Sequence, residues 1–290
     1  MKEANTMDKT KIEWADATWN PVTGCFHSCE YCYARRIAER FAPPSAPRLG
    51  DPGMEGACKL DSDEGMDTML ELETPYKPEG RVIPYPMGFF PTLHKYRLNQ
   101  PRKWAEPRTI FVCSMADLFG EWVPDEWIKA VFDACREAPQ HRYLFLTKNW
   151  MRASKFTYEE NWWVGRTYTH TENSLLPGAS EDKNLYLCYG LPRHKGVVFG
   201  DLRNTFLSIE PLHGPVDDLA YYAHRYGYQW VIVGAETGNR KDRIIPEVEW
   251  VKKIVKDCKL RNIPVFMKDS LIPIIGEENM LRQFPWEVAE

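Results

Sequence analysis

Six short runs rich in β-branched and aromatic residues limit the fold of this chain more than any other feature. They lie at 109–114, 143–147, 162–167, 205–210, 230–235 and 264–268. Most are nearly continuous apolar stretches without strict alternation, a pattern typical of parallel strands buried on both faces. A further run at 17–22, before Cys25, and another at 87–94 bring the expected number of strands to between six and eight.

Helical patterns lie between these runs. Pro124, Asp125 and Glu126 favour a helix start, because proline fits the first turn and acids suit its positive end. The apolar face of that helix is expected to be Trp127, Ile128, Val131, Phe132 and Cys135. Pro246 is expected to open a second helix, with Val248, Val251, Val255 and Cys258 facing inward. Strand–helix alternation predicts an α/β fold, a full or partial TIM-like barrel of six to eight parallel strands.

The chain of 290 residues suits one barrel domain spanning 1–290. Two segments interrupt the alternation, an irregular insertion at about 43–86 and an irregular segment at about 169–203. Long stretches of this kind in a compact domain are typical of lids or binding loops.

The net charge of −4 argues against a strongly basic nucleic-acid binder. Local basic runs are interpreted as solvated faces; they are Arg35, Arg36 and Arg40, then Arg102, Lys103 and Arg108, and then Arg240, Lys241 and Arg243. No apolar run approaches the roughly 18 residues that span a bilayer, and the first eleven residues are polar. We therefore expect no membrane association and a cytoplasmic protein, where thiols stay reduced.

Three of the eight cysteines are closely spaced, as Cys25-x3-Cys29-x2-Cys32. Apolar residues then recur at i, i+3, i+4 and i+7 (Ala34, Ile37, Ala38 and Phe41), which predicts a helix after the last cysteine. The triplet would then lie on a strand-to-helix loop, and such loops form the active-site face of a barrel.

Thiolates normally hold a 4Fe–4S cluster in fours, so three cysteines leave one iron without a protein ligand. An open coordination position is typical of a reactive site. Three alternatives remain open. His27 and the three cysteines can hold zinc, the cysteines can be inert, or a fourth cysteine can close the cluster. The remaining cysteines, 58, 113, 135, 188 and 258, are isolated in the sequence.

Cys25, Cys29, Tyr31 and Cys32 together resemble the Cys-x3-Cys-x-aromatic-Cys signature of the radical S-adenosylmethionine (SAM) superfamily. The resemblance implies that SAM chelates the open iron and that Tyr31 lies near its adenine. It also implies reductive cleavage to methionine and a 5′-deoxyadenosyl radical, which abstracts hydrogen from substrate, and a reductant such as flavodoxin or ferredoxin.

Nearly the whole chain also resembles a phage-associated radical-SAM-like family with a provisional domain name and an unsettled activity. The matching segments lie at 11–14, 17–25, 111–119, 145–148, 206–212, 231–238 and 266–269. Many members have a longer insertion between the first two cysteines, whereas this chain has the compact superfamily spacing. The phage setting implies a nucleobase, a modified DNA base or a nucleotide as substrate.

Polar residues at the expected strand ends are candidates for binding SAM, since barrel ligands lie at carboxyl ends. Superfamily members usually hold the methionyl amino group with a Gly-Gly-Glu motif. This chain lacks that motif, and Ser114 and Asp117 are expected to replace it; an ordinary helix cap is the alternative. Arg166 is expected to pair with the methionyl carboxylate.

Three further strand ends carry charged residues. Glu210 is expected to bind ribose hydroxyls. Glu236 ends a segment similar to a late-strand superfamily motif that supports the adenine, where Gly234 permits close backbone approach. Lys148 and Lys268 are expected to contact an anionic substrate or to donate protons. For each residue the alternative is a salt bridge at the barrel rim.

These observations predict a radical SAM enzyme, whether oxidoreductase, lyase or isomerase, that holds a 4Fe–4S cluster on Cys25, Cys29 and Cys32. The alternative is an iron–sulfur or zinc-stabilised nucleic-acid-binding module without catalysis. No Gly-x-Ser-x-Gly elbow and no phosphate-binding Gly-x4-Gly-Lys loop occur, so neither a serine hydrolase nor a P-loop enzyme is indicated.

Overall fold

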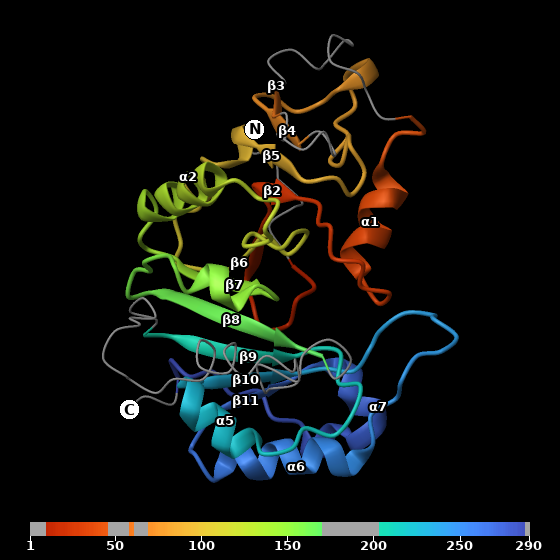
Figure 1. The fold of residues 1–290 in the computed structure, drawn as a ribbon, viewed down its shortest axis with the longest axis vertical. Helices are drawn as coiled ribbons and strands as arrows, with labels where there is room; N and C mark the ends of the chain where they lie inside the picture. Colours follow the sequence, from red (N-terminus) through yellow and green to blue (C-terminus); the bar gives the residue numbers. More distant parts are fainter. Residues whose placement is uncertain (1–9, 46–57, 61–68, 170–202, 288–290) are drawn as a thin grey trace, which may run out of the picture. The chain divides into compact units, whose positions relative to one another are not determined.

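The computed structural model describes residues 10–45, 58–60, 69–169 and 203–287 (Figure 1). The chain divides into two compact units, Met1–Phe145 (unit 1) and Leu146–Glu290 (unit 2). The prediction of one barrel domain over 1–290 stays a prediction. Of the irregular segment expected at 169–203, residues 170–202 lie outside the described part of the chain.

A parallel sheet carries the fold, in the strand order β1-β6-β7-β8-β9-β10-β11. Its strands are β1 (Ala17–Trp19), β6 (Thr109–Val112), β7 (Arg142–Thr147), β8 (Trp162–Tyr168), β9 (Thr205–Ile209), β10 (Trp230–Val233) and β11 (Val265–Met267). Each of the six apolar runs forms one of these strands. The predicted class, α/β with the parallel strands of a partial TIM-like barrel, is therefore confirmed, and seven strands of the described residues belong to this sheet.

A second sheet, in the order β2-β5-β4-β3, was not predicted. It consists of β2 (Val22–Thr23), β3 (Cys58–Leu60), β4 (Met69–Leu72) and β5 (Thr92–His94). The run before Cys25 therefore divides into β1 and β2. The run at 87–94 supplies β5 of this sheet and not an eighth barrel strand, and the described part of the insertion at 43–86 is partly ordered into β3 and β4. The reason is pairing: β4 alone is short, but β5 pairs with it in parallel and with β2 in antiparallel register.

Unit 1 contains the two predicted helices α1 (Tyr33–Phe41) and α2 (Asp125–Arg136). The short 3₁₀ helices are η1 (Pro78–Gly80), η2 (Lys95–Arg97) and η3 (Pro101–Lys103). As predicted, α2 follows Pro124 with two acids in its first turn, and all five residues of its expected apolar face are buried. Phe132 of α2 packs against Phe119 and Phe145, with ring centroids 6.3 and 5.3 Å away.

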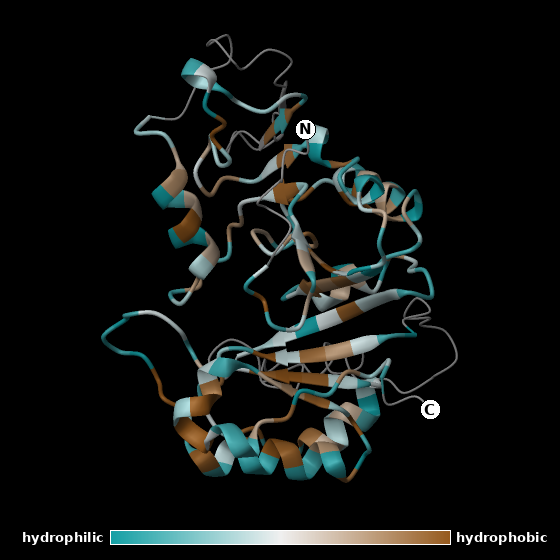
Figure 2. Ribbon diagram, turned by 180° about the vertical axis from the view of Figure 1, so that it is seen from behind, coloured by the Kyte–Doolittle hydropathy of each residue, from teal (hydrophilic) through white to brown (hydrophobic). Residues whose placement is uncertain are grey.

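Unit 2 covers one face of its strands with helices. The helices are α3 (Trp150–Ala153), α5 (Leu219–Tyr226), α6 (Val248–Lys259), α7 (Ile272–Ile275), η4 (Asp269–Leu271) and η5 (Glu277–Asn279). Apolar residues of β9, β10 and β11, including Leu207, Val231 and Val265, pack with Leu219 of α5 and Ile254 of α6. In Figure 2 these strands are largely brown, whereas teal residues line the solvent side of the helices.

The apolar face of α6 differs from the predicted one. Val251, Ile254 and Cys258 are buried, but Val248 is 36% exposed and Val255 only partly buried. Val248 is the first helical residue, and helical side chains lean toward the N-terminus. Its side chain therefore projects beyond the helix rather than onto the sheet, and Ile254 fills the core instead.

None of the helices in the described residues has both the length and the apolarity needed to cross a membrane.

We predict that Ile254→Ala destabilises the protein by about 2–5 kcal/mol, because it removes a fully buried side chain and leaves a cavity. Val248→Ala, on the same helix, should cost less than about 1 kcal/mol, because that side chain keeps water contact. Urea unfolding followed by circular dichroism measures both. Equal losses would contradict the assignment of the α6 face.

Candidate functional site

The three clustered cysteines lie on the loop between β2 and α1, here called the cysteine loop (residues 24–33). The strand before it belongs to the second sheet and not to the parallel one. Cys32 caps α1, since its Sγ accepts a hydrogen bond from the amide of Arg35 at 3.3 Å. The amide of Cys32 also donates to the carbonyl of Cys29 at 3.1 Å. The loop is therefore tied into the helix that follows it.

Glycine is required where the cysteine loop begins. Gly24 has φ +87, and a Cβ there would lie 2.1 Å from the carbonyl oxygen of Phe90. The close approach lets the next amide, that of Cys25, donate to the carbonyl of Phe89 at 3.1 Å. The first cysteine is thereby fixed against the segment that precedes β5.

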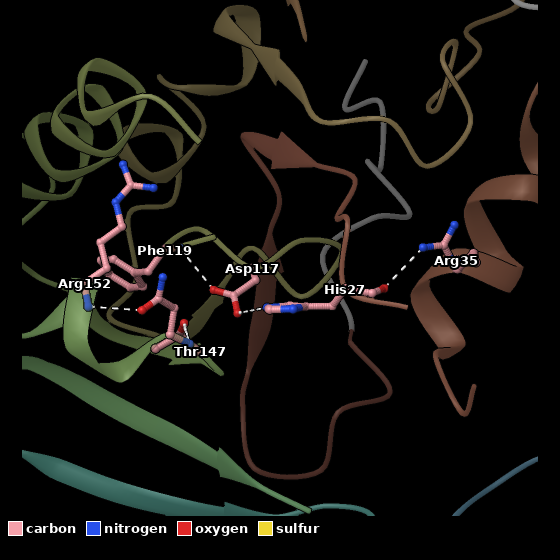
Figure 3. Close-up of polar contacts among 7 residues, drawn as sticks. His27, Arg35, Asp117, Phe119, Thr147 and Arg152 are labelled. Atoms are coloured by element: carbon pink, nitrogen blue, oxygen red, sulfur yellow. Dashed lines mark hydrogen bonds and ion pairs between the residues drawn. The ribbon is translucent and has the colours of Figure 1, made fainter. Parts of the chain in front are cut away.

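The segment after β6, residues 113–117, forms hydrogen bonds with the cysteine loop at three points. The amide of Gly24 donates to Met115 O at 2.9 Å, and Tyr33 Oη donates to Ser114 O at 2.8 Å. His27 Nε2 and Asp117 Oδ2 are 3.1 Å apart (Figure 3). We call this set of contacts the clamp.

Two further features support the clamp. Cys113 adopts the left-handed region with φ +57, which turns the chain at the end of β6 toward the loop. From α1, Arg35 Nη2 donates to the carbonyl of Cys25 at 3.4 Å. It also donates to the carbonyl of His27 at 3.2 Å, as Figure 3 shows. The backbone of the cysteine loop is thus held by protein contacts alone.

Ser114 and Asp117, expected to hold the methionyl amino group, lie beside the cysteine loop, and both already have protein partners. Ser114 Oγ donates to Asn20 Oδ1 at 3.1 Å. Asp117 is buried, and its second oxygen, Oδ1, accepts from the amide of Phe119 at 3.1 Å. That second contact closes a local turn and is not a helix cap, since the next helix, α2, begins only at Asp125. Their contacts with SAM stay a prediction.

The thiol of Cys25 is buried, whereas Cys29 and Cys32 are half-buried, and all three are free thiols. Burial raises the pKa of Cys25 to about 12, and the charges of Asp117, Cys29 and Cys32 add to the rise. Because a metal ligand must be a thiolate, loading this site with iron releases protons.

The donor set fits an iron–sulfur cluster better than a zinc ion. In the described residues no three His, Cys, Asp or Glu side chains converge on one metal position. Zinc requires four ligand atoms around one point, whereas each thiolate of a 4Fe–4S cluster binds a different iron. The Nε2 atom of His27, the fourth ligand in the zinc alternative, is bonded to Asp117, which leaves Nδ1 as the ring nitrogen that can bind a metal. Three thiols of one loop would leave one iron of such a cluster open.

A fourth cysteine ligand finds no support among the described side chains. Cys113, Cys135 and Cys258 are each at most 2% exposed. The charges that raise the pKa of Cys25 include those of Cys29 and Cys32 and of no other described cysteine. The side chain of Cys58, and Cys188 as a whole, lie outside the described part of the chain.

In unit 2, the ends of β9, β10 and β11 bring Glu210, Gly234 and Lys268 together. Lys268 Nζ lies 2.6 Å from Glu210 Oε1, and Ser208 Oγ lies 3.2 Å from Glu210 Oε2. A Cβ on Gly234 would lie 2.9 Å from Glu210 Oε1 and 3.0 Å from Lys268 Cδ. Gly234 therefore makes room for this ion pair, and both charged groups keep partial exposure to water.

Glu236 is almost fully buried, and both of its oxygens are bonded. Arg240 binds it through Nε at 2.7 Å and Nη2 at 2.9 Å, and His213 Nε2 lies 2.9 Å from Oε2. The hydrogen bonds from Arg240 lower the pKa of the Glu236 carboxyl, against the effect of burial and with a smaller contribution from His213. The carboxylate is thus kept ionised and held in place.

Arg166 is buried on the other face of the sheet from Glu210 and Lys268. In the parallel register it pairs with Leu207, which belongs to the helix-covered core of unit 2. Its charge opposes the rise in pKa that burial causes at Tyr226 and Tyr228. Neighbouring residues of a strand point to opposite faces of the sheet. Arg166 pairs with Leu207, so its side chain lies on the face opposite to that of Ser208 and Glu210.

Tyr31 is half-buried in the cysteine loop, and Lys148 is half-buried in the turn between β7 and α3. That turn is fixed locally, since Asn149 donates to Thr147 Oγ1 at 2.9 Å and accepts from the amide of Arg152 at 3.2 Å (Figure 3). The structure therefore brings together Cys25, Cys29 and Cys32 with Ser114 and Asp117 in unit 1, and Glu210 with Lys268 in unit 2.

Sequence reasoning missed several partners of these groups. His27 was considered only as a zinc ligand, and Asn20 and His213 were not considered. Arg240 belongs to a basic run interpreted as a solvated face, although its i, i+4 spacing from Glu236 is a usable signal.

We predict that Asp117→Ala loosens the cysteine loop before any metal is bound. The loss of a buried hydrogen bond to a carboxylate, about 1.5 kcal/mol or more, should speed amide exchange of residues 24–33 about tenfold or more. Hydrogen–deuterium exchange of the metal-free protein measures this. Asp133→Ala is the control, because Asp133 is 69% exposed and pairs with Arg136 on the surface of α2. Unchanged exchange in Asp117→Ala would show that the clamp does not hold the loop.

We also predict that Glu236→Gln destabilises the protein by about 2 kcal/mol or more at neutral pH, because Arg240 and His213 lose a buried anionic partner. The lowered pKa makes this contribution full above the ordinary value of 4.5 and lost as pH falls through the folded-state pKa. The difference between the variant and the unmodified protein should therefore shrink below that pH. Glu160→Gln, at an 88% exposed side chain, is the control and should change stability by less than about 0.5 kcal/mol. A pH-independent difference would contradict this role for the charge.

Comparisons with known proteins agree with this fold. A solved structure of spore photoproduct lyase complexed with dinucleoside spore photoproduct has a TM-score of 0.50, with 10% sequence identity over 92% of this chain and 80% of that chain. Spore photoproduct lyase is a radical SAM enzyme. No curated protein matches the chain. A family model does match, over residues 9–271, and the chain therefore belongs to the family described as Protein of unknown function (DUF5131).

Proposed function

We propose that this protein is a radical SAM enzyme that holds a 4Fe–4S cluster on Cys25, Cys29 and Cys32. The observation that carries the proposal is a loop with three free thiols, held by protein hydrogen bonds. Three thiolate ligands would leave one iron of a 4Fe–4S cluster without a protein ligand. The likeness in fold to spore photoproduct lyase supports it. When bound, such a cluster supplies the electron for reductive cleavage of SAM, which yields methionine and a 5′-deoxyadenosyl radical for hydrogen abstraction.

Residues of unit 1 would hold the cofactor. Tyr31, beside Cys32, would lie near the adenine. Ser114 and Asp117 would face the methionyl amino group, but their present bonds to Asn20 and His27 suggest that they also position the loop. Both roles, binding SAM and positioning the loop, are consistent with the place of these two residues next to the cysteines.

Three residues of unit 2 are also proposed as SAM ligands, on the strength of the resemblance in sequence alone. Glu210, whose side chain is 20% exposed beside Lys268, would accept hydrogen bonds from ribose hydroxyls. Glu236 would act by fixing His213 and Arg240, since both of its oxygens are already bonded. Arg166 would reach the methionyl carboxylate only by leaving the helix-covered face, so it is the least supported member of this set.

Two lysines are proposed to act on the substrate. Lys268, which lies 2.6 Å from Glu210, would donate a proton to the substrate or would bind an anionic group. Lys148, in the turn after β7, would likewise donate a proton or bind an anionic group. Either role requires the positive charge and not merely the length of the side chain.

The proposed substrate is a nucleobase, a modified DNA base or a nucleotide, in keeping with the phage setting of the resemblance. The likeness to a structure complexed with a dinucleoside supports this class. The reaction would be that of a lyase, an isomerase or an oxidoreductase. A flavodoxin or ferredoxin would supply the electron, and the reducing cytoplasm would protect the thiols.

We predict that anaerobically purified protein is brown and carries about four irons per chain. Dithionite and SAM should then release 5′-deoxyadenosine, measured by liquid chromatography. Cys29→Ala should lose both the iron and the release. Cys258→Ala, which alters a buried core cysteine, should keep both.

Two results would overturn the proposal. Colourless protein with stoichiometric zinc would show that the cysteines bind a zinc ion and not a 4Fe–4S cluster. An iron-replete protein that leaves SAM intact under dithionite would favour a non-catalytic nucleic-acid-binding module.

A further inference from the structure

Helix α1, which follows Cys32, exposes its large apolar residues and buries its small ones. Ala34 and Ala38 are 6% and 0% exposed. Tyr33, Ile37 and Phe41 are 43%, 38% and 47% exposed. An ordinary surface helix does the reverse, with its large apolar side chains toward the core. This helix therefore presents an apolar and aromatic surface to its surroundings.

Arginines lie within the same exposed surface. With 3.6 residues per turn, positions three, four, seven and eight after Tyr33 fall on one side of the helix. These positions are Arg36, Ile37, Arg40 and Phe41. We call the five residues, Tyr33 included, the α1 face; in Figure 2 teal and brown segments alternate along this helix.

The charge of the α1 face is wholly positive. Glu39 is the sole acidic residue of α1, and with Arg35 it lies on another side of the helix. Neither Arg36 nor Arg40 forms an ion pair with any residue in the part of the chain that the structure describes. Arg40 instead places its guanidinium 5.5 Å from the ring centroid of Phe41. A cation next to an exposed ring is an arrangement that suits a flat, anionic ligand.

Exposed aromatic rings also occur at the start of the cysteine loop. Phe26, 37% exposed, lies 6.0 Å from the ring of Phe90 and 5.4 Å from that of Trp122. Trp122 Nε1 is buried and has no hydrogen-bond partner among the described residues. Phe26 follows Cys25 and Tyr33 follows Cys32, so exposed rings adjoin both the first and the last cysteine.

We propose that the α1 face, together with Phe26, binds single-stranded nucleic acid next to the cysteine loop. Bases would stack on Tyr33, Phe41 and Phe26, and Arg36 and Arg40 would contact phosphates. Stacking requires bases that are not already paired, so a single strand fits this surface and a duplex does not. This inference rests on the proposed function in one respect: the nucleobase proposed there as substrate would here be part of a bound single strand.

Charge is the reason for choosing nucleic acid over a protein partner. Two arginines that form no ion pair with the described residues complement a polyanion, and only a local patch is needed although the whole chain carries a charge of −4. A partner protein would be expected to bury the aromatic rings without strong dependence on salt.

The test is fluorescence anisotropy of a labelled single-stranded oligonucleotide titrated with anaerobically purified full-length protein. Phe41→Ala should weaken binding by about tenfold, the loss of one stacked base. Arg36→Ala combined with Arg40→Ala should also weaken binding. For two phosphates it should reduce the slope of log K against log salt by about 1.4.

Unit 2 offers a matched control on α5. Tyr221 is 51% exposed, and Arg225 places its guanidinium 6.0 Å from the ring centroid, as Arg40 does with Phe41. Tyr221→Ala combined with Arg225→Ala should leave oligonucleotide binding unchanged. An equal loss in this control would overturn the proposal, since binding would then follow any exposed aromatic–arginine pair.

Other outcomes are equally decisive. Unmodified protein that binds no oligonucleotide, or binds duplex and single strand equally, overturns the proposal; binding of a protein partner that Phe41→Ala abolishes without salt dependence would replace it. Release of 5′-deoxyadenosine from SAM without substrate should be the same in Phe41→Ala as in unmodified protein. If that release is absent from both while oligonucleotide binding depends on Phe41, the proposed function fails and this inference stands.

Discussion

The hydrogen bonds between the cysteine loop and the segment after β6 are the constraint on which the candidate site depends. Three thiols that must lose protons to bind metal repel one another as thiolates. Burial is the main cause of the raised pKa of Cys25, and the charges of Asp117, Cys29 and Cys32 add to it. A flexible loop would relieve the repulsion by separating the sulfurs. Here hydrogen bonds hold the loop at Gly24, at His27 and at Tyr33, which limits how far the three cysteines can move apart. The conformational entropy of ordering the loop is then lost on folding and not on loading.

Much of the parallel sheet could be predicted from the sequence, and the reason is local. A buried parallel strand is recognised as a continuous apolar run. The start of α2 is recognised from Pro124 and the two acids that follow it. The second sheet could not be predicted in this way. β2 has two residues and β4 four, and neither is a recognisable strand without the pairing that β5 supplies from a distant part of the chain. Only the tertiary contact makes these residues extended.

The candidate site, too, has parts that the sequence predicts and parts that depend on tertiary contacts. The spacing of Cys25, Cys29 and Cys32 is visible in the sequence because one loop carries all three. The partner of Asp117 is not visible, since His27 lies 90 residues away. Glu210 and Lys268 meet because two strands end side by side, and the face on which Arg166 lies follows from strand register. A charged residue at a strand end is therefore easy to find, whereas its partner and its face require the fold.

Helix α1 joins the clamp to the exposed face. A helix that buries only two alanines gains little stability from the hydrophobic effect, so something else must hold it. The contacts that do so are polar: the Cys32 cap at its start, the Tyr33 bond to Ser114 O, and the two hydrogen bonds from Arg35. These contacts leave Ile37 and Phe41 unused by the core of unit 1. The interactions that hold the cysteine loop therefore also hold α1, and one side of this helix stays exposed. The proposed nucleic-acid surface then lies directly beside the proposed cluster.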